Sequence, residues 1–421
     1  MRRLVAVITV VSLVSLIGIA CAPAQAPPPE IKEKELKIGV QLILTGPLAS
    51  AFATGSTGVK LYLKYVNDEL GGIEYRDPVS GKVDHVRLDL LLEDNAFNPA
   101  KAISIYKRQK AAGVKMMIVM GSAACEGVTG FLEHDHMPNI AAFSTMSEIL
   151  KSPYFMSDRD APLDVLASIM NWIIDNRTEP GQPTIGLILP NYPSYRLMAN
   201  PEQLPAFATE KDINLLWEWV TLPPTDVTLE LTRLMKEEPD WIILQLVPAA
   251  HATVLKDAQR LAVWDKVKWA TIAGSATERI VDYAGELSEG FYQQVMTSLP
   301  TEDVPGIQLA SHIWEKYENR QLEILGVQCI PDAMFICEGI RLALEETGYK
   351  DLTSDDLLNG FLSVADLDTK GLTPPLTIDP KWPLMNPYTK MTVIEGGKVK
   401  SVSDWYEYPG LTRRIVGDFQ R

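Results

Sequence analysis

The chain has 421 residues, of which 46% are hydrophobic and 22% are charged, a composition typical of a soluble globular protein. This length exceeds one ordinary core and, at roughly 100 to 200 residues per domain, predicts two or three domains. The formal net charge of −15 argues against a nucleic-acid partner, because duplex binding rests largely on the neutralisation of phosphates by Lys and Arg.

The first residues have the pattern of a secretory signal. Arg2 and Arg3 precede residues 4–20, which are apolar throughout. A membrane-spanning anchor is the alternative, but this run falls short of the usual span of about 20 residues. We therefore expect residues 1–20 to be a signal peptide. Because this leader holds two arginines and no acid, its removal makes the net charge −17.

Two cleavage modes fit the leader. Ala24-Gln25-Ala26 has the small residues of an ordinary cleavage site, but Pro27 would follow the cut. Gly18-Ile19-Ala20-Cys21 resembles a bacterial lipobox, although its glycine replaces the usual Leu, Val or Ile. We favour lipidation of Cys21, which makes a lipid anchor the expected membrane contact. Residues 21–35, rich in Pro and Ala, would then form a semi-extended tether.

Lipidation of Cys21 would leave Cys125, Cys329 and Cys337, an odd number in an oxidising compartment. A disulfide between the last two requires α-carbons within about 7 Å of each other. Cys329 precedes Pro331, which is expected to open a helix, and Cys337 lies well inside that helix. We therefore expect all three thiols to be buried small side chains rather than a redox site.

Short apolar runs alternate with longer helical or loop segments in the first part of the chain, at residues 36–44, 86–94, 114–121 and 139–145. This alternation predicts βαβ units and a parallel sheet covered by helices. Within it we expect strands at 37–44, 87–92 and 116–120, a helix at 58–70, a hairpin turn around Asp77-Pro78, and Asn98 as a helix N-cap.

The same alternation returns after residue 158 and predicts a second parallel sheet, with strands at 184–190, 214–220, 241–247 and 268–274. A further strand is expected to cross back from residue 290. Helices are expected after it, at 307–318, 332–347 and 354–361. Near the C-terminus, residues 389–402 predict a strand pair that turns at Gly396-Gly397.

Ligands of open α/β sheets collect outside the carboxyl ends of the strands. In the first sheet these ends are expected at 45–48, 93–95, 121–124 and 143–145. Free backbone amides at the helix start near Ser122 are suited to an anionic or carbonyl group. Alternatively, Ser122 simply caps that helix.

The sequence lacks the patterns of a catalytic site. No GxSxG motif is present, and no GxGxxG follows an expected strand. Glu93 and Asp94 are adjacent, so on a strand their side chains point to opposite faces and do not make a carboxylate pair. His134 and His136 flank Asp135, but no further metal ligand is close in sequence. We therefore expect a binding protein that is not an enzyme and that has no metal or cofactor.

Several short motifs occur in a characteristic order. TGP follows the first strand, NDELGG ends the next helix, EDN and NPAKA follow the second long strand, and GSAA follows the third. In this order, the chain from Leu36 to the C-terminus resembles the type I periplasmic solute-binding proteins of branched-chain amino acid and amide ABC transporters, the leucine/isoleucine/valine-binding proteins among them. The resemblance implies an α/β fold of two lobes, each a parallel sheet flanked by helices, with a hinge between them.

The resemblance also implies how the chain is divided and what it does. Lobe one would comprise residues 36–156 plus 291–380, and lobe two residues 157–290 plus 381–421. Such proteins close their lobes on a small solute and hand it to a membrane permease, and the protein is expected to be a monomer.

Residues of the ligand site can be carried over from the family by position. Ser122 and Ala123 match the loop that grips the ligand carboxylate, and Tyr195 matches an aromatic residue of the cleft. The other expected ligand-binding residues follow strands, namely Phe143, Ser144, Thr145, Gln245, Val247, Gly274 and Ser275.

The sequence departs from the family pattern at the position that would pair with the ammonium group of an amino-acid ligand. Family members that bind amino acids place a carboxylate near the position of Gly274 and Ser275, whereas the nearest acid here is Glu278, expected on a helix. An unpaired buried ammonium is costly. We therefore expect a small, partly apolar carboxylate, amide or aromatic compound in preference to a branched-chain amino acid. A ligand-sensing module of the same fold, without a transport role, is the alternative function.

Overall fold

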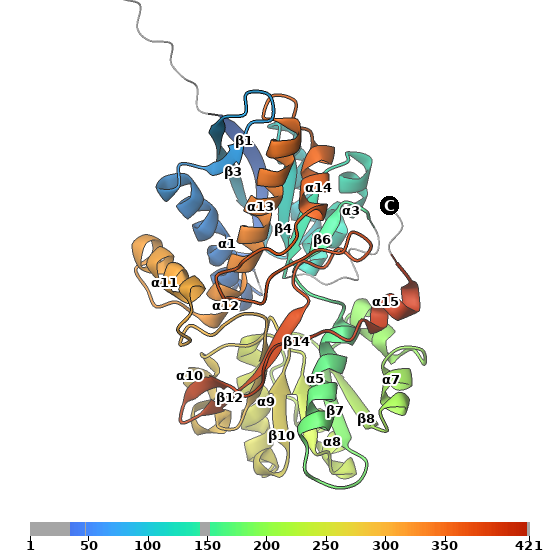
Figure 1. The fold of residues 1–421 in the computed structure, drawn as a ribbon. Helices are drawn as coiled ribbons and strands as arrows, with labels where there is room; N and C mark the ends of the chain where they lie inside the picture. Colours follow the sequence, from blue (N-terminus) through green and yellow to red (C-terminus); the bar gives the residue numbers. More distant parts are fainter. Residues whose placement is uncertain (1–33, 47, 144–151, 419–421) are drawn as a thin grey trace, which may run out of the picture. The chain divides into compact units, whose positions relative to one another are not determined.

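The computed structural model describes residues 34–46, 48–143 and 152–418, and the chain from Lys34 onward forms one compact unit. This unit contains two β-sheets, each flanked by helices (Figure 1). The predicted α/β class with two largely parallel sheets is confirmed.

The first sheet has the strand order β2-β3-β1-β4-β5-β6. Its neighbours are parallel except β2, which pairs antiparallel with β3. The expected hairpin is therefore present, and Asp77 Oδ1 shapes its turn by accepting hydrogen bonds from the amide and hydroxyl of Ser80 at 2.8 and 2.9 Å. The strands are β1 (Glu35–Leu42), β2 (Ile73–Arg76), β3 (Val83–Asp94), β4 (Met116–Met120), β5 (Asn139–Ala142) and β6 (Phe155–Ser157).

Helix α1 (Ala49–Glu69) begins well before the expected start at residue 58. Gly55 and Gly58 suggested a loop, but both lie inside the helix. A β-carbon at Gly58 would come within 2.3 Å of the carbonyl oxygen of Gly326, and one at Gly55 within 2.1 Å of Phe143 Cζ. These glycines therefore allow close packing against the helix, at the modest cost that glycine carries in a helix interior.

The second sheet has the order β13-β12-β11-β10-β9-β7-β8, with β14 (Tyr406–Glu407) paired to β12. The strands β7 to β11 are parallel neighbours, whereas β11–β12 and β12–β13 are antiparallel. Their bounds are β7 (Thr184–Pro190), β8 (Asn214–Val220), β9 (Trp241–Leu244), β10 (Lys268–Thr271), β11 (Tyr292–Val295), β12 (Tyr388–Glu395) and β13 (Lys398–Ser401).

Strand β11 lies in a different sheet from the one expected. From the sequence we expect the lobe boundary at 290/291, which would put this strand in lobe one. In the structure β11 pairs with β10 and β12 in the second sheet, with Ala270 opposite Tyr292 and Val295 opposite Lys390. The chain therefore leaves the second sheet only after residue 295.

Helices cover both sheets (Figure 1). The expected cap is present at α2, where the Asn98 side chain accepts a hydrogen bond of 2.9 Å from the Lys101 amide. The longer helices besides α1 are α2 (Pro99–Ala111), α3 (Ser122–His134), α5 (Pro162–Asn176), α9 (Pro248–Arg260), α11 (Pro305–Glu318), α13 (Ile330–Thr347) and α14 (Ser354–Leu362). The shorter ones are α6 (Pro193–Arg196), α7 (Leu204–Glu210), α8 (Thr228–Leu234), α10 (Ile280–Ala284), α12 (Ile324–Gln328) and α15 (Leu411–Val416).

One hydrophobic core joins the first sheet to α1 and to the late helices α11 to α14. Trp314 is fully buried in it and lies against Gly326, where a β-carbon would come within 2.6 Å of the indole ring. Cys125 and Cys329 are buried, as expected, whereas Cys337 is only half-buried. Late helices thus complete the lobe that the N-terminal strands begin.

Candidate ligand-binding site

A cavity of about 630 Å³ lies where strands of both sheets end, within the range of about 300–1,000 Å³ typical of small-molecule sites. Its walls come from the segments that follow β3, β4, β5 and β6 in the first sheet and β7, β8, β9 and β10 in the second, together with α1. The lining is mostly apolar, as in the aromatic pair Phe52 and Phe143, whose ring centroids are 5.0 Å apart. Such a surface suits the apolar body of an organic solute.

The structure brings most of the residues predicted from the sequence around this single cavity. They are Ser122, Ala123, Phe143, Tyr195, Gln245, Val247, Gly274 and Ser275. Ser144 and Thr145 lie outside the described residues. The side-chain oxygen of Gln245 is buried without a hydrogen-bond partner among the described residues, so it can serve a ligand.

Ser122 is the first residue of α3 rather than its N-cap. The N-cap is Gly121, whose φ of +90° favours glycine, and no side chain makes a capping hydrogen bond there. Simple capping by Ser122, one of the two alternatives, is therefore wrong. Ser122 is half-buried, and it lines the cavity together with Ala123, the second residue of the helix.

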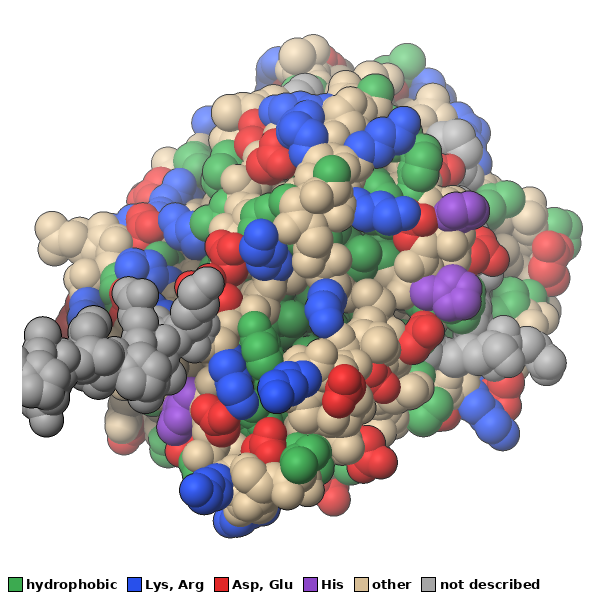
Figure 2. Space-filling model, turned by 90° about the horizontal axis from the view of Figure 1, so that it is seen from above, with side chains coloured by type: hydrophobic (Ala, Val, Ile, Leu, Met, Phe, Trp, Pro, Cys, Tyr) green, Lys and Arg blue, Asp and Glu red, His purple; other side chains and the backbone are tan. Residues whose placement is uncertain are grey.

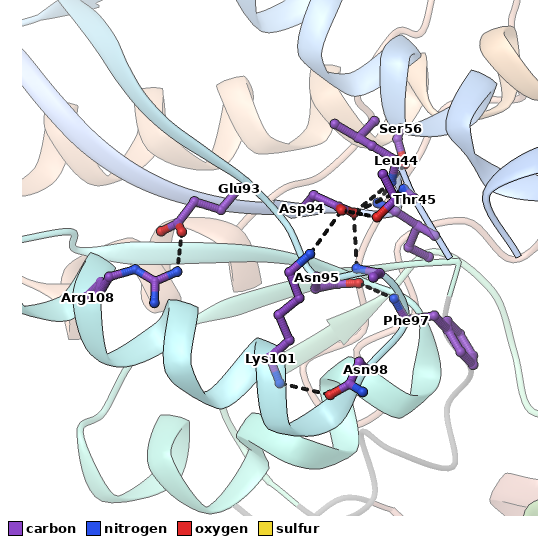
Figure 3. Close-up of polar contacts among 12 residues, drawn as sticks. Leu44, Thr45, Ser56, Glu93, Asp94, Asn95, Phe97, Asn98, Lys101 and Arg108 are labelled. Atoms are coloured by element: carbon purple, nitrogen blue, oxygen red, sulfur yellow. Dashed lines mark hydrogen bonds and ion pairs between the residues drawn. The ribbon is translucent and has the colours of Figure 1, made fainter. Parts of the chain in front are cut away.

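Asp94, at the end of β3, organises the loops at the rim of the first sheet (Figure 3). Its carboxylate accepts hydrogen bonds from the Leu44 amide at 2.9 Å and from the Lys101 ammonium at 3.0 Å, and it also bonds the Thr45 hydroxyl. Burial alone would raise its pKa, but these donors outweigh that effect and hold the pKa of Asp94 well below its usual range. Asp94 is not among the cavity-lining residues.

The neighbouring Asn95 positions an aromatic wall of the cavity. Its side chain accepts a hydrogen bond of 2.8 Å from the Phe97 amide and donates one of 3.0 Å to the Met120 carbonyl oxygen. Phe97, held at φ +57°, lines the cavity (Figure 3). Of the EDN motif, Asn95 thus positions a residue that lines the cavity, and none of the three residues of the motif lines it directly.

Arg159, the cation of the cavity wall, was not predicted from the sequence. It follows β6, a strand of only three residues that no apolar run had marked. Arg159 is 8% exposed, and its guanidinium lies 5.2 Å from the ring centroid of Phe143. Because β6 is so short, the sequence carries no periodic signal that would have identified Arg159.

Asp158 holds Arg159 in place. Its carboxylate accepts hydrogen bonds from Arg159 Nε at 3.3 Å and Nη2 at 2.7 Å, and from the Phe143 amide at 3.0 Å. Burial opposes the charge on Arg159, but the adjacent carboxylate outweighs it and raises the pKa of the guanidinium. The pair thus forms a preorganised cation at the end of β6.

A second buried carboxyl, Asp332 at the start of α13, lies near this pair. Burial and the charge of Asp158 raise the pKa of Asp332 well above its usual value.

Glu278, the acid nearest in sequence to Gly274, does not line the cavity. It lies in the turn before α10 rather than on the helix. Its carboxyl oxygens accept hydrogen bonds of 3.1 and 3.2 Å from the Ile324 amide at the start of α12. Burial, aided by the charge of Glu323, raises the pKa of Glu278 to about 7.

This shift predicts a pH dependence of stability. Because the folded state holds the proton more tightly than the unfolded state, the contribution of Glu278 is full below its ordinary pKa of 4.5 and is lost as the pH rises through about 7. Glu278→Gln keeps an acceptor for Ile324 without the charge. At about pH 8 it should raise the free energy of unfolding by on the order of 1–3 kcal/mol, measured by denaturant titration.

The exposed Glu286 provides the matched control, since Glu286→Gln should leave the pH profile of the parent protein unchanged. An equal pH dependence in Glu278→Gln and the parent protein would show that Glu278 is not the titrating group.

The surface seen from above in Figure 2 carries acidic and basic side chains interspersed, without a continuous basic face. In the described part of the chain, no helix is long and apolar enough to cross a membrane. The same residues contain no group of three or more His, Cys, Asp or Glu that could hold a metal ion.

Comparison with known proteins defines the class. The sequence model of the family described as periplasmic binding protein matches residues 35–398, so the chain belongs to that family. Its members are solute-binding proteins rather than enzymes, and membership implies a location outside the cytoplasm. A comparison with curated protein sequences finds no match.

Solved structures share the fold at low sequence identity. A branched chain amino acid ABC transporter from Thermus thermophilus with bound valine is 18% identical, with a TM-score of 0.76 over 91% of this chain and 99% of that chain. A fatty acid ABC transporter substrate-binding protein from Thermomonospora curvata is 19% identical, with a TM-score of 0.73 over 90% and 94%. A solute binding protein from Rhodopseudomonas palustris BisB5 in complex with 3,4-dihydroxy benzoic acid is 18% identical, with a TM-score of 0.71 over 90% and 99%. The two-lobed fold of type I periplasmic binding proteins is confirmed.

Proposed function

We propose that the protein captures a small, partly apolar solute between its lobes and delivers it to the permease of an ABC transporter. The observation that carries this proposal is the convergence of strand ends from both sheets on one mostly apolar cavity with a few polar groups. Proteins of similar fold bind valine and 3,4-dihydroxybenzoic acid, which supports a carboxylate, amide, aromatic compound or branched-chain amino acid as the solute.

Capture proceeds by hinge closure, with lobe one preorganising the ligand and lobe two completing the site. Lobe one comprises residues 36–156 and the late helices up to about residue 380, which share one hydrophobic core with the first sheet. Lobe two comprises residues 157–295, because β11 belongs to the second sheet, together with 381–421.

The mature protein acts as a monomer outside the cytoplasm, anchored by lipid at Cys21 through the tether 21–35. Its sequence supports this arrangement through the lipobox-like run that ends at Cys21 and the Pro-rich segment after it. Neither a cofactor nor a nucleic acid takes part.

A ligand-sensing module of the same fold is the second candidate. The two roles separate in cells: deletion of a transport protein abolishes uptake of the solute, whereas deletion of a sensor abolishes only the response to it. Permease and ATPase genes beside the coding gene favour transport, and a kinase or chemoreceptor gene favours sensing.

Two cleft substitutions test the site. Ser122→Ala removes a hydroxyl beside the first amides of α3, and Tyr195→Ala removes an aromatic wall. Each should weaken solute binding by about 10-fold, the effect of one hydrogen bond or one buried ring, while the unliganded melting temperature stays nearly unchanged. Isothermal titration calorimetry measures the dissociation constants.

Matched variants control both substitutions. Ser104→Ala changes an exposed helical serine outside the cavity and should bind solute normally. Tyr195→Phe separates the ring from its hydroxyl. Unchanged affinity in both Ser122→Ala and Tyr195→Ala would place the binding site elsewhere.

A further inference from the structure

The charged groups of the cavity are unevenly distributed between the ends of the two sheets. Among the described lining residues, Arg159 and Glu126 are the charged side chains, and both follow strands of the first sheet. Glu126 is exposed on α3, whereas Arg159 is 92% buried against Phe143. The segments after β7, β9 and β10 contribute no acid to the wall. A desolvated cation therefore has no counterpart across the cavity.

The guanidinium is held on one side and available on the other. Nε and Nη2 are engaged by Asp158, whereas Nη1 has only a 3.5 Å contact with the Ala273 carbonyl oxygen, which is long for a hydrogen bond. A guanidinium carries five N–H donors in one plane, so donors remain beyond those that Asp158 uses. Asp158 fixes the plane, which lowers the entropy lost when a ligand binds.

We infer that Arg159 anchors the head group of the solute, and that the solute is an organic carboxylate with an apolar body and no ammonium group. This inference rests on the proposed function and names the chemical class that the site takes. Carboxylates match the planar donor pair of a guanidinium, and the charge-assisted hydrogen bonds gain strength where water is excluded. The aromatic and aliphatic walls accommodate the apolar body.

An amino acid satisfies this site less well. Its ammonium group would enter a mostly apolar cavity in which the wall formed by the second sheet supplies no carboxylate, and Glu126, on the side of the first sheet, is exposed. Desolvation of an unpaired charge costs several kcal/mol. Gln245 offers a neutral amide oxygen, which compensates a charge only in part. The same apolar skeleton should therefore bind more tightly without its ammonium group.

The test compares matched probes on the unmodified mature protein by calorimetry. The pairs are 4-methylpentanoate with leucine, 4-methylpentanoate with 4-methylpentanamide, and benzoate with benzamide. In each pair that binds, the carboxylate should bind on the order of 10- to 100-fold more tightly than its partner, the effect of charge-assisted hydrogen bonds. Equal or tighter binding of the amides or of leucine would overturn the inference while leaving solute binding intact. Binding of no probe at all would overturn both the inference and the proposed solute range.

Substitutions of Arg159 test whether this residue anchors the head group of the solute. Arg159→Gln should lose the preference for carboxylate over amide, and Arg159→Lys should keep part of it, because a lysine retains the charge without the planar donor pair. Arg108→Gln, which changes an exposed arginine outside the cavity, should keep the full preference. Melting temperatures identify any variant that fails to fold, and the probe pairs on the parent protein decide the ligand class without any variant. An undiminished preference in folded Arg159→Gln would overturn the assignment.

Discussion

Asp158→Asn is expected to lower the free energy of unfolding by about 3–5 kcal/mol, the usual cost of breaking a buried ion pair from one side. Asp158 is 2% exposed and is the carboxylate that contacts Arg159, at 2.7 Å. The substitution leaves a guanidinium in an apolar wall without a countercharge and weakens the acceptor for the Phe143 amide. Denaturant titration at neutral pH measures the loss.

The same change in an exposed pair is the control. Asp68 pairs with Lys64 at 2.6 Å on the surface of α1, and Asp68→Asn should cost only about 0.3–0.5 kcal/mol. A loss of similar size in the two variants would mean that the Asp158–Arg159 pair is as well solvated as a surface pair.

Gly274→Ala is expected to weaken binding of a carboxylate solute by at least about 10-fold, because it displaces the anchor. A β-carbon at Gly274 would lie 1.8 Å from Arg159 Nη1 and 2.8 Å from Cζ, so the guanidinium must move. The backbone there has φ +87°, which itself disfavours alanine. Calorimetric titration of the variant with benzoate or 4-methylpentanoate measures the effect.

Gly290 separates the steric effect from backbone strain. It also has a positive φ, +74°, but a β-carbon there would meet nothing within 4 Å. Gly290→Ala should therefore lose some stability and keep its affinity. Binding by Gly274→Ala within about twofold of the parent protein would show that the position of Arg159 does not matter for the ligand.

Much of the fold could be predicted because the signals are local. Apolar runs located β4 and β7 with their observed bounds, and Asn98 followed by Pro99 marked the start of α2. The start of α1 could not be predicted, because Gly55 and Gly58 read locally as loop residues and are explained only by close contacts with Phe143 and Gly326. The sheet to which β11 belongs was likewise set by pairing with a strand almost a hundred residues later.

Some residues of the candidate site could likewise be predicted from the sequence, and others could not. Residues that follow strands marked by apolar runs in the sequence, such as Ser122 and Gly274, were predicted and do line the cavity. Arg159 was not predicted, because β6 has only three residues and shows no hydrophobic periodicity. Phe97 was not predicted either. It is positioned by a hydrogen bond to Asn95 and by a left-handed backbone conformation, and the pattern of apolar residues reveals neither of these.

The cavity at the ends of both sheets is proposed to bind a small organic solute. A thermal-shift screen of the chain from Ala22 onward tests it most directly, with branched-chain and polar amino acids, short amides, and aliphatic and aromatic carboxylates as candidates. A ligand at about a hundred times its dissociation constant adds about 2.7 kcal/mol to stability, an easily measured shift. We expect that shift with carboxylates and not with leucine or valine. A shift with an amino acid alone would contradict the assigned ligand class, and no shift with any solute would contradict the claim itself.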